Sequence, residues 1–321
     1  METTYGIISD IHAADPQRVI TALRILTKQL GVENLILNGD LIGERCPESR
    51  PQDNLAAIIG AAVNTGVKVY ALEGSHEEIA LAQPIFDHYS RQANFFDACQ
   101  NPVVDGIGHR LLFLPGSDWH AADVRRGVYL IDEQPASLES GFYQTTQGDP
   151  LHLTNITDVV KYTRDPKRTI VVSHIPRAFD GPIETAVDMA YFAERADKSL
   201  MPGVVVENAI RQRASRPLSD ADILRIAAQN GFTMKREHRG NQKLRAAFEQ
   251  AGITKAVNGH FHESAHRAHD SNVVPLSEGG YHDELFWMAS YLDEEKVGML
   301  RVNDEGQVAY QNINIQDYRR K

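Results

Sequence analysis

The stretch Ile7-Ile8-Ser9-Asp10-Ile11-His12 decides the fold, because its apolar residues predict a short buried strand that ends in polar residues. Side-chain alternation stops where a strand ends, so a carboxylate and an imidazole two residues apart can turn toward a common point. Asp10 and His12 together suit a borderline divalent cation such as Zn²⁺, Mn²⁺ or Fe²⁺. An isolated Asp-x-His match is more often a turn Asp beside an ordinary His, so the rest of the chain must supply partners.

Composition places the chain of 321 residues in the ordinary soluble globular class, with 42% hydrophobic and 24% charged residues. The net charge of −10 opposes a surface that binds nucleic acid throughout, although bound metals would attract an anionic substrate locally. Cys46 and Cys99 cannot form a disulfide framework and fit a reducing compartment. Because the sequence shows neither a signal peptide nor a membrane span, we predict a cytoplasmic protein without a membrane partner.

Helices alternate with short apolar strands through the first part of the chain. A helix is expected to begin at Asp15-Pro16, followed by a strand over 35–37, a helix over about 54–64 and a strand over 67–72. This order predicts parallel strands with right-handed crossovers. Their C-terminal ends share one edge of the sheet, which is where open α/β sheets bind ligands.

Polar residues follow the expected strands at that edge. Further buried strands are predicted over 110–114, 169–173 and 255–257, separated by a long excursion over about 121–153 that has no clear period. Five strand ends then present Asp10 with His12, Asp40, Ser75 with His76, His174, and His260 with His262.

In this order the set resembles the calcineurin-like metallophosphoesterase superfamily, whose pattern is Asp-x-His, Gly-Asp, Gly-Asn-His-Asp/Glu, a lone His and Gly-His-x-His. The resemblance spans Asp10 to His262. It implies a four-layer α/β/β/α sandwich of two mixed sheets flanked by helices, with the site at the strand C-termini. Since ligands from both ends would meet at one site, residues 1–321 are expected to form a single domain, with a mainly helical insertion or cap over 177–253.

The resemblance also implies a centre of two divalent metal ions. The family's ligand positions fall on Asp10, His12 and His262 for the first metal, on Ser75, His174 and His260 for the second, and on Asp40 as the bridge. Mn²⁺ is favoured, with Zn²⁺, Fe²⁺, Ni²⁺ and Mg²⁺ as alternatives, because such mixed sites accept several ions. A hydroxide that bridges the metals would attack phosphorus in line.

His76 matches the catalytic imidazole of the family, which would protonate the leaving oxygen as a general acid or stabilise the charge on phosphorus. Glu77 is a candidate for the carboxylate that keeps this imidazole charged. The chain departs from the family at Ser75, where the family has Asn, whose amide oxygen reaches further and is a better neutral ligand. The second metal site is therefore expected to bind more weakly, and a single bound metal is expected beside Asp10.

Three residues are candidate substrate contacts. Arg45 lies in a stretch similar to the Gly-Asp-x-x-Asp-Arg motif of protein phosphatases, but the spacing is one residue longer, and surface charge is an equal alternative. His120 follows Ser117-Asp118-Trp119 and could approach the site from a neighbouring loop. Arg239 belongs to a basic cluster inside the insertion, which is either a solvated face or a cap that meets an anionic substrate.

Metal-dependent hydrolysis of phosphoesters is the function that the resemblance implies. A phosphodiester or nucleotide-type substrate is favoured over a phosphoprotein, because the phosphatase arginine spacing is not kept. A nuclease of the same superfamily is one alternative, disfavoured by net charge but allowed by the basic insertion. The other is a non-catalytic binding or regulatory protein with a degraded second metal site, which Ser75 supports and the intact histidines oppose.

Overall fold

The structure, a computed structural model, describes most of the chain. The described residues are 2–12, 16–43, 51–77, 79–117, 136–139, 142–145, 156, 158–181, 183–214 and 216–319. Arg45, Cys46 and His120 lie outside these residues, so the expectations for them stay predictions.

The first sheet has six strands in the order β17-β16-β1-β2-β3-β4. Its parallel neighbours are β1 (Glu2–Ile8), β2 (Asn34–Asn38), β3 (Lys68–Leu72) and β4 (Phe95–Asp97). Two C-terminal strands extend it in antiparallel fashion, β16 (Lys296–Asn303) and β17 (Val308–Asn314). The helical connections are α1 (Pro16–Arg24) with the π-helical turn η1 (Ile25–Gln29), α2 (Pro51–Val63) and α3 (Ile79–Tyr89). The parallel strand–helix order predicted from the sequence is confirmed.

The second sheet also has six strands, in the order β14-β15-β13-β9-β6-β5. Its four inner strands are parallel: β6 (Arg110–Leu114), β9 (Thr169–Ser173), β13 (Lys255–Asn258) and β15 (Leu285–Met288). Its antiparallel edges are β5 (Val103–Asp105) and β14 (Ala268–His269). Helical segments beside this sheet are α4 (Asp158–Tyr162), η2 (Pro166–Arg168) and α7 (Gln242–Ala251). Both large sheets are therefore mixed, as expected.

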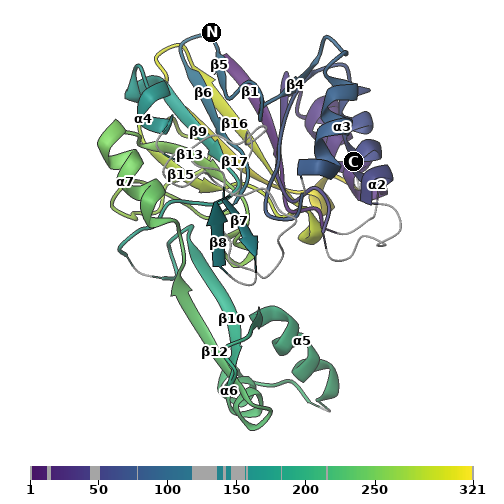
Figure 1. The fold of residues 1–321 in the computed structure, drawn as a ribbon, viewed down its shortest axis with the longest axis vertical. Coiled ribbons are helices and arrows are strands. Elements are labelled where there is room, and N and C mark those ends of the chain that lie inside the picture. Colours follow the sequence, from purple (N-terminus) through teal and green to yellow (C-terminus); the bar gives the residue numbers. More distant parts are fainter. Residues whose placement is uncertain are drawn as a thin grey trace.

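Alternation along β6 places apolar residues on both faces of the second sheet. Leu111 and Phe113 belong to the core that includes the strands of the first sheet. Leu112 and Leu114 belong to a second core, together with Phe248 of α7. Helices α2 and α3 lie outside the first sheet, while α4 and α7 lie outside the second (Figure 1). Such double-sided burial explains why the inner strands read as continuous apolar runs rather than alternating ones.

An arm extends away from the two sheets between β9 and β13 (Figure 1). Its three-stranded sheet has the order β11-β10-β12, and helices α5 and α6 pack on it around a small core of its own. The arm's elements are β10 (Met189–Arg195), β11 (Leu200–Pro202), α5 (Gly203–Arg213), α6 (Asp220–Gln229) and β12 (Phe232–His238). The sequence predicts the helices of this region but not its strands, because β12 is rich in charged residues and has no apolar alternation.

Shorter elements complete the described chain. Within the stretch expected to lack a clear period, β7 (Ala136–Glu139) and β8 (Phe142–Thr145) form an antiparallel pair. Three single turns are η3 (His262–Ser264), η4 (Leu292–Glu294) and η5 (Ile315–Tyr318). Over the part of the chain that the structure describes, none of the helices combines the length and the apolar character needed to cross a membrane.

Candidate metal centre and active site

The loops that follow β1, β2 and β13 turn sharply, and each carries a candidate ligand at the turn. Asp10, Asp40 and His260 have φ angles of 53°, 49° and 78°, and His12 has 39°. This left-handed region is uncommon for residues other than glycine, and it persists where the surrounding structure over-determines it. The strain is concentrated at the shared edge of the two sheets, which is where the sequence analysis expects the site.

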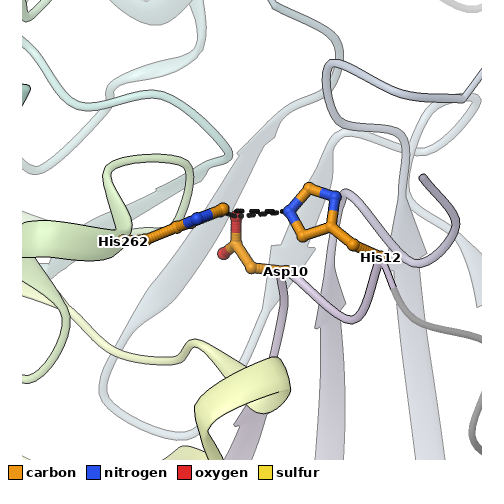
Figure 2. A group of neighbouring side chains, drawn as sticks. All are labelled: Asp10, His12 and His262. Carbon is orange, nitrogen blue, oxygen red and sulfur yellow. Dashed lines mark hydrogen bonds and ion pairs between the residues drawn. The ribbon is translucent and has the colours of Figure 1, made fainter. Parts of the chain in front are cut away.

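The first group of converging side chains comprises Asp10, His12 and His262 (Figure 2). Nε2 of His262 lies 3.2 Å from Oδ1 of Asp10 and 3.0 Å from Nε2 of His12. Nε2 of His12 lies 3.8 Å from the same carboxylate oxygen. Two imidazole nitrogens and a carboxylate oxygen thus face one point, which is a donor set suited to a divalent cation.

The second group comprises Asp40, His174 and His260. Nδ1 of His174 donates to the carbonyl oxygen of Asn38 at 2.9 Å, which leaves Nε2 facing Oδ2 of Asp40 at 2.9 Å. This Nε2 is buried and has no hydrogen bond of acceptable geometry among the described residues. A lone pair against a carboxylate is repulsive, so the arrangement requires a cation, either a proton on Nε2 or a metal ion. The donor set fits a divalent metal ion.

Asp40 lies between the two groups and forms a third possible ligand group with His12 and His76. Its Oδ2 is 3.9 Å from Nε2 of His12 and 3.8 Å from Nε2 of His76, in addition to the contact with His174. Its Oδ1 accepts hydrogen bonds from the backbone N–H groups of Ser75 at 2.5 Å and His76 at 2.9 Å. The hydroxyl of Ser75 donates to Oδ2 at 2.8 Å. Ser75 therefore orients the carboxylate of Asp40, which faces His12 of the first group and His174 of the second.

The charges of this cluster are strongly coupled. Burial opposes ionisation of Asp10 and Asp40, but the surrounding imidazoles lower the pKa of both carboxyl groups. Burial likewise opposes protonation of His174, yet the charge of Asp40 prevails and raises its pKa to about 10. Burial and the neighbouring His174 lower the pKa of His260 to about 3, so this imidazole is neutral at pH 7. Without a metal, protons balance the two buried carboxylates.

Glu77 ties two of the loops together. Its carboxylate accepts hydrogen bonds from the backbone N–H groups of Asp40 at 3.0 Å, Gly74 at 2.7 Å and Ile42 at 3.1 Å. Burial, followed by the charge of Asp40, raises the pKa of Glu77 to about 7. Its hydrogen bonds thus go to the backbone of the loops after β2 and β3, rather than to the imidazole of His76 as the sequence suggested.

The structure brings together the sequence candidates for metal binding and for proton transfer, and of the substrate candidates it describes Arg239 alone. The residues that converge are Asp10, His12, Asp40, Ser75, His76, His174, His260 and His262. Arg239 lies just beyond β12, with its guanidinium 4.3 Å above the ring of Phe192 and 3.8 Å from the carboxylate of Glu237. Arg45 and His120 fall outside the described residues.

Tyr291 is a site neighbour that the sequence analysis missed. Its ring stacks on the imidazole of His262, with centroids 3.9 Å apart and planes inclined by 16°. It follows β15, far from every motif of the family pattern. No spacing rule could single it out, since an aromatic residue after a buried strand is ordinary.

Replacement of Gly74 by Ala is expected to disrupt the site. A Cβ there would lie 2.5 Å from Oδ1 of Asp40 and against its backbone nitrogen. The loops would have to separate, so we expect a loss of about 1–3 kcal/mol in the free energy of unfolding and weaker metal binding. Gly280→Ala is the control, because its Cβ meets nothing nearer than 3.6 Å. Equal chemical denaturation curves for the two variants would contradict the close approach.

Metal affinity is expected to rise with pH between about 6 and 9. The pKa of His174 is raised to about 10 and that of His12 is also raised, so both hold protons that a metal must displace. Since imidazole binds metal only when that nitrogen is deprotonated, fewer protons compete as the pH increases. Calorimetric titration of the metal-free protein with Mn²⁺ should show tighter binding at higher pH together with proton release. Affinity independent of pH would be inconsistent with these charges.

Comparisons with known proteins give a family for the chain and structures of similar fold. A family model described as calcineurin-like phosphoesterase matches residues 3–264, whereas no curated protein matches the chain. TT1561 of Thermus thermophilus is similar in structure, with a TM-score of 0.51 and 8% identity over 98% of this chain and 100% of that chain. A dimetal phosphatase from Danio rerio has a TM-score of 0.44 and 11% identity, over 98% and 99%. On the family match, the chain belongs to the calcineurin-like phosphoesterase family.

Proposed function

We propose that this protein hydrolyses a phosphodiester or nucleotide-type substrate with two divalent metal ions and with His76 as the general acid. The family and the three groups of possible metal ligands support a metal-dependent phosphoesterase. The observation that carries the proposal is the placement of Asp40, whose carboxylate is shared by two converging groups of ligand atoms.

In the proposal, the ligands divide between the two ions as the sequence pattern implies. Asp10, His12 and His262 would hold the first ion, Ser75, His174 and His260 would hold the second, and Asp40 would serve both. When bound, two such ions polarise phosphoryl oxygens and lower the pKa of water enough for attack at neutral pH. Mn²⁺ is favoured, and Zn²⁺, Fe²⁺, Ni²⁺ and Mg²⁺ are alternatives, since imidazole and carboxylate donors accept all of them.

His76 is suited to deliver a proton to the leaving oxygen. Its side chain is 15% exposed, so it can reach a substrate, and its Nε2 lies 3.8 Å from the carboxylate of Asp40. Its ring also meets that of His12 edge to face, with centroids 4.7 Å apart. The ring contact limits the rotation of the imidazole, as a positioned proton donor requires.

The arm begins beside the site, which supports a role as a cap over one continuous domain. The hydroxyl of Ser264, in the turn that begins with His262, donates to the carbonyl oxygen of Met189 in β10 at 3.2 Å. Residues 177–253 would then be an insertion that reaches toward bound substrate, with Arg239 among its cationic residues. Arg45 and His120 remain proposed substrate contacts. The non-matching phosphatase arginine spacing supports a diester or nucleotide over a phosphoprotein.

One observation favours a second candidate, a binding protein with a degraded second metal site. The hydroxyl of Ser75 is hydrogen bonded to both oxygens of Asp40, at 3.0 Å and 2.8 Å. It is therefore committed to that carboxylate, unlike an Asn amide oxygen that reaches a metal. A nuclease of the same family is the alternative within enzymes, and its discriminating substrate is a DNA or RNA oligonucleotide.

Activity separates these candidates. Metal analysis should accompany hydrolysis of p-nitrophenyl phosphate, bis(p-nitrophenyl) phosphate and an oligonucleotide, each with added Mn²⁺, Zn²⁺, Ni²⁺ or Mg²⁺. We expect turnover of the diester to exceed that of the monoester. Bound metal without turnover of any substrate would overturn the enzyme proposal in favour of the binding protein.

Replacement of His76 by Ala is expected to lower kcat by about 10²- to 10⁴-fold, which is the usual contribution of a positioned proton donor. Metal content should not change, because His76 is not among the proposed ligands. His88→Ala on α3 is the control, since His88 is exposed and its substitution should leave kcat unchanged. If His76→Ala turns over as fast as wild type, the acid assignment is wrong.

Replacement of Ser75 by Asn is expected to tighten the weaker metal site by about tenfold, or about 1.4 kcal/mol. The amide oxygen would reach further and be a stronger neutral ligand than the hydroxyl of Ser75. Stepwise calorimetric titration with Mn²⁺ measures both sites in the two proteins. Two equally tight sites in the wild type, unchanged in Ser75→Asn, would show that Ser75 does not weaken the second site.

A further inference from the structure

His262 differs from His174 in how its ring is held. The metal-binding nitrogen of a histidine is normally oriented by a hydrogen bond that the other ring nitrogen makes. His174 follows this rule, because its Nδ1 donates to the carbonyl oxygen of Asn38 at 2.9 Å. His262 makes its contacts through Nε2, and among the described residues its Nδ1 has no hydrogen-bond partner. Its side chain is also 28% exposed.

Tyr291 contacts the face of this imidazole, in addition to the edge-to-face contact that the ring makes with His12. The two rings are nearly parallel, inclined by 16° with centroids 3.9 Å apart, so the tyrosine covers one face of the imidazole. Tyr291 itself is only 8% exposed. A rigid aromatic plane pressed against a partly exposed ring restricts the rotation that would carry Nε2 away from Asp10 and His12.

The segment that carries Tyr291 is fixed to the loop that carries Asp10. The N–H groups of Leu292 and Asp293 donate to the carbonyl oxygens of Ser9 at 3.2 Å and Asp10 at 3.3 Å. The N–H of Tyr291 donates to the carbonyl oxygen of Lys296 at 3.0 Å. The tyrosine is therefore placed by the same backbone that places the first carboxylate, which gives its ring a defined position relative to the site.

We propose that Tyr291 is the positioning residue of His262, and that its stacked ring sets the affinity of the metal held by Asp10, His12 and His262. The inference rests on the proposed function, because it assumes that these residues bind metal. The ring plane carries the effect rather than the hydroxyl. Tyr291→Phe should therefore retain the metal affinity of the wild type, whereas an aliphatic residue at this position should lower it.

Titration of metal-free protein with Mn²⁺ tests this without an activity assay. Tyr291→Leu should weaken one of the two sites by roughly 2- to 12-fold, the usual worth of an aromatic contact, and leave the other unchanged. Tyr291→Phe and Tyr291→Trp should bind as the wild type does. Tyr281→Leu is the control, since Tyr281 is 38% exposed and contacts Glu2 at the opposite end of β1 from Asp10.

The titration distinguishes an effect of the tyrosine ring from an effect of its hydroxyl and from a loss of stability. Equal affinities for Tyr291→Leu and the wild type would overturn the proposal, and weakening in Tyr291→Phe would assign the effect to the hydroxyl and overturn it as well. The melting temperature of each metal-free variant separates positioning from loss of stability. If Tyr291→Leu and Tyr291→Trp both bind Mn²⁺ more weakly, and only together with a lowered melting temperature, Tyr291 would have a structural role and no positioning role. Absence of metal binding by the wild type would instead refute the proposed function itself.

Discussion

Two buried carboxylates held among imidazoles are the constraint on which the site depends. Asp10 and Asp40 have 0% and 1% of their surface exposed, and isolated ionised carboxylates are costly at such depth. Backbone N–H groups and histidine nitrogens surround both of them. The remaining negative charge needs a cation, so the same feature that would destabilise an ordinary core creates a binding site for metal.

The fold places this charge by bringing together loops that are distant in sequence. Glu77 fastens the loop after β2 to the loop after β3 through three backbone N–H groups. Gly39 and Gly74 let those loops approach more closely than a Cβ would allow. The loop after β1 is held from the other side by the segment that follows β15. Positive φ angles at the ligands are tolerated because these contacts fix the loops on several sides.

Sequence reasoning predicted the strands that carry the ligands because each ends in a short polar motif after an apolar run. Asp10 and Asp40 follow this rule in the first sheet and His174 follows it in the second, and the structure brings the ends of these strands together. This rule does not identify β12 of the arm, since Lys235 and Arg236 interrupt any apolar alternation in that strand. The hydrogen bonds by which Glu77 holds two loops together, and the stacking of Tyr291 on His262, could not be predicted either. Their contacts depend on the three-dimensional approach of loops, which no spacing within the sequence records.

If two metal ions share Asp40, anomalous diffraction from crystals grown with Mn²⁺ should locate both of them. We expect two anomalous peaks, one on each side of the Asp40 carboxylate. One should lie beside Asp10, His12 and His262, and the other beside His174 and His260. At limiting Mn²⁺ the peak beside Asp10 should be the stronger one. Peaks elsewhere, or no peak within reach of Asp40, would contradict the account.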